Sequence, residues 1–145
     1  MKSKMVLIVL MLLALIVACT VEPKPIEYGS DACSFCQMTI VDRQHAAEMV
    51  TKKGKAYKYD AIECMVRDLN RNHDASQVGI VLITDFAEAG NLVDAKKAAY
   101  LISENIPSPM GANLSGFEEK SEAERVQKQE GGSLFTWNQL LERFK

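Results

Sequence analysis

The sequence has no excess of positive charge. Its 17 lysines and arginines face 19 acidic residues, which gives a formal net charge of −2 at pH 7. Proteins that bind nucleic acid need a basic face, so this balance argues against nucleic acid as a partner. Histidines are also scarce, with only two in the chain. His45 and His73 both lie in polar stretches, where surface histidines are common, so they are weaker candidates for metal ligands than the sulfur residues described below.

An apolar run long enough for a typical membrane span is also lacking. Met5–Val17 is unbroken and apolar, but it is shorter than the roughly 20 residues that a spanning helix needs. Two lysines precede it, and Ala18 and Cys19 follow it. This order predicts a lipoprotein signal peptide over residues 1–18, with Cys19 lipidated as the mature N-terminus. The alternative is an uncleaved transmembrane helix. Both readings hold the protein at a membrane, facing the periplasm or the extracellular side.

The chain has too few cysteines for a disulfide framework. It contains four, and lipidation of Cys19 leaves Cys33, Cys36 and Cys64. An odd number in an oxidising compartment leaves at least one thiol without an internal disulfide partner. This favours a metal ligand or a reactive thiol.

Two of these cysteines belong to a C-x-x-C-x-M motif, Cys33 to Met38. We expect a strand over Cys36–Val41, in which alternate side chains share a face and bring Cys36 and Met38 together. Thiolate and thioether sulfurs are soft ligands that select Cu(I). The alternatives are a short disulfide, a redox-active motif and half of a structural zinc site. A redox motif is usually followed by a helix that lowers the thiol pKa, and the β-type run here lacks one.

Residues 19–29 contain two prolines and a glycine and are predicted to form a linker. Residues 30–86 are predicted to form a ββαβ unit. A helix capped by Asp60 and Glu63 presents an apolar stripe, and Cys64 points about 150° away from its centre, at 100° per residue. Besides the strand at the motif, the expected strands are Ala46–Thr51, Ala56–Tyr59 and Val78–Thr84.

Residues 87–145 are predicted to repeat the pattern. Asn91–Asp94 and Ala98–Ser103 would form a hairpin around two lysines, and Ser121 with Glu124 would cap a helix that ends at Gly131. After a strand over Ser133–Phe135, Thr136 with Gln139 would cap a short C-terminal helix. The predicted fold class is therefore α+β, with two ββαβ units in one compact body.

Met110 follows two prolines in the segment Ile106–Gly111. Proline fixes its own φ angle and pushes the preceding residue toward extended geometry. Such a loop can present Met110 rigidly as a third sulfur ligand. The alternative is a methionine that only fills a gap in the core.

The combination of these features is similar to the NosL family of copper-binding lipoproteins. The likeness covers nearly all of the mature chain and rests on the cysteine at the end of the signal and on four internal motifs. These motifs are Asp31–Met38, Ala46–Glu48, Tyr59-Asp60 leading into Cys64-Met65, and Pro107–Gly111. One departure is Gln37, where the family often has glycine.

The resemblance implies two ββαβ units with a shape likened to organomercurial lyase. It also implies one Cu(I) bound by Cys36, Met38 and Met110, carried for the maturation of nitrous oxide reductase without catalytic turnover. Cys33, His45 and Cys64 are additional candidate ligands, and Glu48 is a neighbour that the sequence cannot place. Two other functions stay open, namely a lipid-anchored thiol-disulfide oxidoreductase and a structural zinc module that uses the three cysteines and a histidine.

Overall fold

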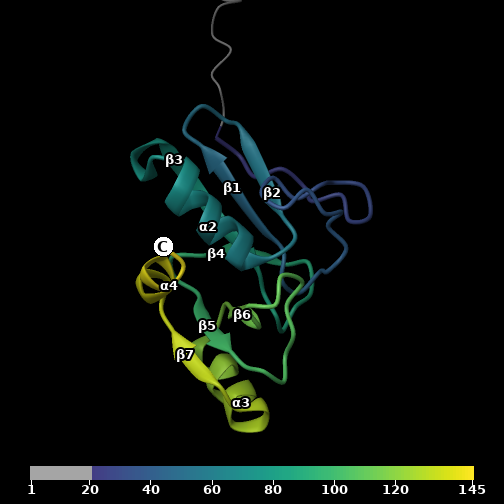
Figure 1. Ribbon diagram of the computed structural model, residues 1–145, viewed down its shortest axis with the longest axis vertical. Helices are drawn as coiled ribbons and strands as arrows, with labels where there is room; N and C mark the ends of the chain where they lie inside the picture. Colours follow the sequence, from purple (N-terminus) through teal and green to yellow (C-terminus); the bar gives the residue numbers. More distant parts are fainter. Residues whose placement is uncertain (1–20) are drawn as a thin grey trace, which may run out of the picture.

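The computed structural model describes residues 21–145 and places them in one body with two antiparallel sheets and three α-helices (Figure 1). This architecture confirms the predicted α+β class. The predicted signal peptide and Cys19 lie outside the described residues. Among the residues that are described, no helix is both long and apolar enough to cross a membrane.

The first sheet has the strand order β2-β1-β3-β4. Its strands are β1 (Ala47–Thr51), β2 (Ala56–Tyr59), β3 (Val78–Thr84) and β4 (Leu92–Asp94). Helix α2 (Ile62–Asn72) contacts β1 and β2 and buries its apolar stripe, and a short 3-10 turn, η1 (Ala75–Gln77), leads into β3.

The second sheet has the order β6-β5-β7. Its strands are β5 (Ala99–Ile102), β6 (Leu114–Phe117) and β7 (Ser133–Phe135), and its helices are α3 (Lys120–Glu130) and the C-terminal α4 (Trp137–Arg143). In the first sheet β1 lies between β2 and β3, and in the second sheet β5 lies between β6 and β7. In both cases a strand is flanked by the next strand in the chain and by the strand that follows the helix. The repeated ββαβ pattern expected from the sequence is therefore present.

The main hydrophobic core is shared by both units. Ile62 of α2 and Ile83 of β3 are fully buried in the same cluster as Tyr100 of β5 and Leu114 of β6. A Cβ atom at Gly116 of β6 would lie 2.1 Å from the Ile83 side chain. The absence of a side chain at this position thus lets the two sheets approach each other.

The strands predicted at both ends of the Lys96-Lys97 hairpin are present, but the hairpin is wrong and one strand of the second unit was not predicted. β4 does not form a hairpin with β5, because it pairs with β3 of the first sheet, while β5 pairs with β6. The backbone at Asp94 accepts hydrogen bonds from Lys97 and Ala98 and so turns the chain from one sheet to the other. Strand β6 was missed because its sequence, Leu-Ser-Gly-Phe, is buried at every position and shows no alternation of polar and apolar residues.

The helix caps were predicted with mixed success. Thr136 and Gln139 form the expected capping box of α4. Helix α3 ends at Gly131 as expected but begins at Lys120, so Ser121 is not its cap. Helix α2 is preceded by Ala61, with no side-chain cap. The Asp60 carboxylate instead accepts a hydrogen bond from the Cys36 thiol. Asp60 therefore contacts a thiol and does not cap the helix.

Two adjacent glycines after α3 provide a matched test of the fold. Gly132 has a φ of +97°, and a Cβ there would lie 2.2 Å from the carbonyl oxygen of Ile102, whereas Gly131 has a φ of +71° and open space around it. Gly132→Ala is expected to lower the free energy of unfolding by about 3 kcal/mol, because strain and overlap add. Gly131→Ala is expected to cost about 1 kcal/mol. Urea unfolding measures both, and equal losses would contradict this packing.

Candidate metal centre

The C-x-x-C-x-M motif forms a tight loop. The strand predicted over Cys36–Val41 is wrong, because residues 34–36 form a turn and Gln37 has a φ of +64°. The backbone N–H of Cys33 donates to the carbonyl oxygen of Met38 at 2.8 Å, and that of Gln37 donates to the carbonyl oxygen of Cys33 at 3.0 Å. Strand alternation therefore does not place Cys36 and Met38 on one face. The left-handed backbone at Gln37 is the geometry that glycine adopts without strain.

Three thiols and a carboxylate converge beneath this loop. The ligand atoms of Cys33, Cys36, Cys64 and Asp60 all lie within 4.8 Å of one another. Cys33 and Cys64 are fully buried, Asp60 is 2% exposed, and Cys36 is half-buried. All three cysteines are free thiols. The described part of the chain thus contains one compact group of three sulfur donors and a carboxylate, contributed by the motif loop, the first turn of α2 and Asp60, two residues before that helix.

Cys64 reaches this group because it does not face the stripe of its own helix. The stripe residues of α2 pack into the core, and the opposite face, at the first turn, carries Cys64. Ser34 of the motif loop is held to β2 by its N–H, which donates to the carbonyl oxygen of Lys58 at 2.8 Å. The loop covers Cys64, so a position that the sequence placed off the stripe becomes buried.

Hydrogen bonds and burial make the three thiols chemically different. Donation from the Cys64 thiol, assisted by the backbone N–H groups of Cys36 and Asp60, lowers the pKa of Cys33 to about 6. The same bond raises the pKa of Cys64, because its proton is held by the Cys33 sulfur. Burial, with Asp60 and Cys33 nearby, raises the pKa of Cys36 to about 11. Cys33 is therefore the thiol most readily deprotonated, and metal binding must displace the protons of the other two.

Asp60 is the residue that the sequence interpretation did not identify as part of the site. The Cys36 thiol donates to its Oδ1 at 3.3 Å, while its buried Oδ2 has no hydrogen-bond partner among the described residues. A sequence signal was available, because Asp60 belongs to the motif in which Tyr59-Asp60 leads into Cys64-Met65. That signal was read as helix capping instead.

Both methionines predicted as ligands are at least partly exposed. Met38 is 50% exposed, and Met110 is half-buried against the same core cluster as Cys36. The Met110 loop is attached to α2 by the fully buried Glu63, whose Oε1 accepts from the Ser108 hydroxyl at 2.5 Å and from the Ala112 N–H at 3.3 Å. Because Glu63 precedes Cys64 directly, the proline loop is held to the helical turn that carries a thiol.

The family model described as NosL matches residues 25–144. The chain belongs to the NosL family. Its fold is similar to the crystal structure of the copper chaperone NosL from Shewanella denitrificans, with a TM-score of 0.72 and 20% sequence identity. The likeness covers 82% of this chain and 95% of that one. No curated protein matches the chain.

The other residues considered as ligands or neighbours are held elsewhere in this NosL fold. His45 is 3% exposed rather than at the surface, with Nδ1 2.8 Å from Asp42 Oδ2 and Nε2 3.2 Å from Ser115 Oγ. His73 lies 3.1 Å from Asp68 Oδ2. Glu48 is fully buried, accepts the Lys24 N–H at 2.6 Å, and burial raises its pKa. None of the three joins the thiols in the described cluster.

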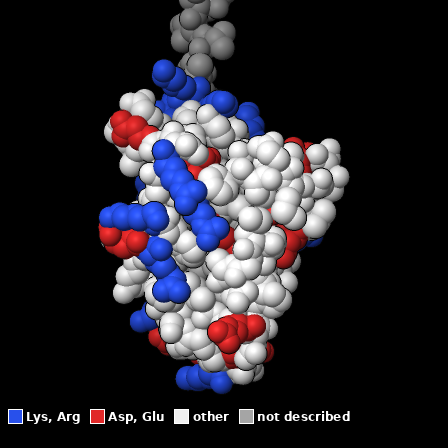
Figure 2. Space-filling model, viewed as in Figure 1, with Lys and Arg blue, Asp and Glu red and all other residues white. Residues whose placement is uncertain are grey.

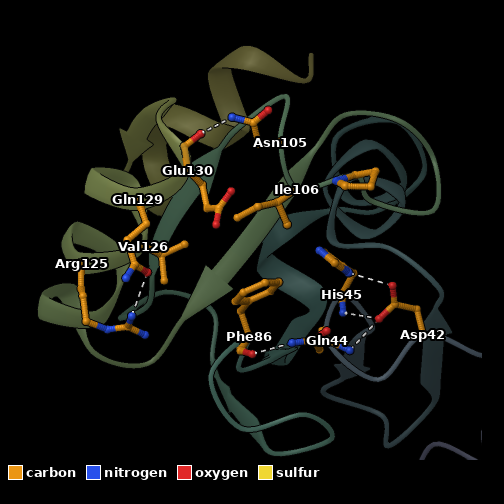
Figure 3. A pocket seen from close by; sticks show the side chains of 11 residues that line it. Asp42, Gln44, His45, Phe86, Asn105, Ile106, Arg125, Val126, Gln129 and Glu130 are labelled. Atoms are coloured by element: carbon orange, nitrogen blue, oxygen red, sulfur yellow. Dashed lines mark hydrogen bonds and ion pairs between the residues drawn. The ribbon is translucent and has the colours of Figure 1, made fainter.

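His45 instead borders a pocket of about 480 Å³ whose opposite wall is formed by residues of α3 (Figure 3). Phe86 and Ile106 give it apolar walls, and Arg125 of α3 lies at its rim. The Arg125 guanidinium is already bound to Glu122 and Gln129. The pocket contains no sulfur donor, so it is separate from the metal centre.

Proposed function

We propose that the protein is a membrane-anchored, extracytoplasmic Cu(I) carrier that delivers copper for the maturation of nitrous oxide reductase. Copper is the cargo, held by Cys36, Met38 and Met110 and passed to an acceptor without catalytic turnover. Membership of the NosL family supports this proposal, and so does the copper chaperone named for the solved structure of the same fold.

The observation that carries the proposal is the graded exposure of the sulfur donors. The half-buried thiol of Cys36 is followed two residues later by Met38, a large apolar side chain that is 50% exposed. Thiolate and thioether together select Cu(I). A donor that protrudes into solvent is accessible to an acceptor protein, so the metal can leave the way it entered. A storage site would bury its ligands completely.

Met110 supplies the second thioether from the other unit. Glu63 of α2 accepts hydrogen bonds from both ends of the Met110 loop, Ser108 and Ala112, and Pro109 stiffens the segment between them. A pre-organised ligand loses little conformational freedom on binding. Copper would therefore join the motif loop of the first unit to the proline loop of the second.

The proposed anchor is the lipid on Cys19. The first described residue, Val21, lies beside Gly79 of β3, and the backbone of Lys52 also lies near Gly79. The exposed β1–β2 turn at this end carries Lys52, Lys53 and Lys55, and Figure 2 shows basic side chains gathered there. Basic side chains close to an anchor favour an anionic membrane surface.

A thiol-disulfide oxidoreductase is the second candidate, because the pKa of Cys33 is lowered to about 6. A nucleophilic thiol must also be accessible to its substrate, and Cys33 is fully buried. Turnover of a model disulfide at a rate that depends on Cys33 would favour this candidate over copper carriage.

Copper carriage is tested by anaerobic titration of the reduced, detergent-solubilised protein with Cu(I) in the presence of a Cu(I) chelator. The expected result is one Cu(I) per chain, retained in excess Zn(II), because the thioethers add affinity only for the softer ion. Displacement of Cu(I) by an equal amount of Zn(II) would contradict the proposal. The cysteine-free variant with Ser at positions 33, 36 and 64 is the control for non-specific copper.

A further inference from the structure

The thiol cluster contains more donors than the proposed copper position uses. Cys36 belongs to both, but Cys33, Cys64 and Asp60 have no part in ligation by Met38 and Met110. These three side chains are at most 2% exposed, and their ligand atoms lie within 4.8 Å of one another and of the Cys36 sulfur. The core therefore holds four donors, three sulfurs and one oxygen, in one place.

One oxygen of the cluster lacks the partner that a positive ion would supply. Asp60 Oδ2 is buried without a hydrogen-bond partner in the described chain. A buried polar atom left unpaired costs free energy, and a bound cation would satisfy it.

Charge and coordination number identify the class of ion. Three thiolates and a carboxylate carry four negative charges, and burial of uncompensated charge is costly. A divalent ion leaves less residual charge than Cu(I). Sulfur and carboxylate oxygen in a closed four-ligand set match structural zinc sites, where ligand atoms stand about 3.7 Å apart for metal–sulfur bonds of about 2.3 Å. The donors, now within 4.8 Å, need to approach by only about 1 Å to reach that geometry.

We propose that Cys33, Cys36, Cys64 and Asp60 form a second metal site, selective for divalent d10 ions such as Zn(II). On binding, the thiols lose their protons to solvent and Asp60 exchanges the Cys36 S–H bond for the metal. Because Cys36 serves both positions, zinc and copper exclude each other, and the zinc-bound protein is a resting form with its thiols closed. The zinc site itself does not depend on copper carriage, whereas the exclusion of copper and the resting form rest on the proposed function.

The test titrates the reduced, metal-free full-length protein in detergent with Zn(II) and, as a spectroscopic probe, with Cd(II). The ultraviolet sulfur-to-cadmium absorption scales with the number of thiolates, so the unmodified protein is expected to give a three-thiolate intensity at one Cd(II) per chain. Cys64→Ser and Asp60→Asn are each expected to weaken Zn(II) binding at least tenfold. Met38→Ala and Met110→Ala are matched controls that should leave it unchanged. Zn(II) should also raise the melting temperature.

A one-thiolate cadmium signal in the unmodified protein would overturn the proposal, and this measurement needs no variant that might misfold. Loss of Zn(II) affinity in Met38→Ala with none in Cys64→Ser would also overturn it. The experiments can contradict the zinc site and copper carriage independently. A three-thiolate Cd(II) signal without Cu(I) binding would leave the zinc site and remove copper carriage, whereas Cu(I) binding with a one-thiolate Cd(II) signal would do the reverse.

Discussion

Cys36→Ser is expected to lower Cu(I) affinity by more than a hundredfold, because it removes the only anionic sulfur of the proposed copper position. Loss even of a group that only orients a metal ligand costs about 10- to 100-fold, and a direct ligand should cost more. Met38→Ala should cost about tenfold, or about 1.4 kcal/mol, since a neutral thioether contributes less. Competition with a chelator under anaerobic conditions measures both. Neither variant should unfold the metal-free protein, because neither side chain is fully buried.

Cys33→Ser is the matched control, because it changes the other cysteine of the motif in the same way. Cys33 is fully buried beneath the loop, so its loss should weaken Cu(I) binding much less than loss of Cys36. If Cys33→Ser and Cys36→Ser lower the affinity equally, copper is bound by the buried thiols and not by Cys36 with the two methionines.

Cys19→Ser is expected to move the protein completely from the membrane to the soluble extracytoplasmic fraction. One acyl chain holds a protein only reversibly, whereas the several chains of a bacterial lipoprotein anchor it stably. Removing the modified residue removes all of them at once. Cell fractionation and the mass of the mature chain measure the result, and Cys33→Ser, which keeps the anchor, is the control.

The opposite outcome has a definite meaning. A Cys19→Ser variant that stays in the membrane at unchanged size would show that Met5–Val17 is an uncleaved transmembrane helix. The proposed copper position would be unaffected, since Cys36, Met38 and Met110 all lie within the described residues.

Those parts of the fold that the sequence predicts correctly have strong local signals. The 3.6-residue stripe of α2 and the Thr136–Gln139 cap of α4 both depend on neighbours along the chain. β4 and β6 depend on long-range pairing. Nothing within Leu92–Asp94 shows that it joins β3, and the buried Leu114–Phe117 has no alternation.

The same distinction applies to the metal centre. The motif, and the direction of Cys64 away from the apolar stripe of α2, could be predicted from residue spacing. In the structure, that direction brings Cys64 to the two cysteines of the motif loop. The left-handed Gln37 could not be predicted, because glutamine seldom adopts a positive φ. Asp60 was interpreted as a cap because aspartate before a helix usually is one, and only tertiary contacts show it beside a thiol.

The most direct test of the copper site compares the Cu(I) affinity of Met110→Ala with that of Cys64→Ala. Met110 comes from the second unit and is half-buried, whereas Cys64 lies fully buried in α2. Copper bound by Cys36, Met38 and Met110 predicts that Met110→Ala lowers the affinity about tenfold and that Cys64→Ala lowers it less. If Cys64→Ala costs as much as Cys36→Ser while Met110→Ala costs nothing, copper lies between the motif loop and α2, and Met110 is not a ligand.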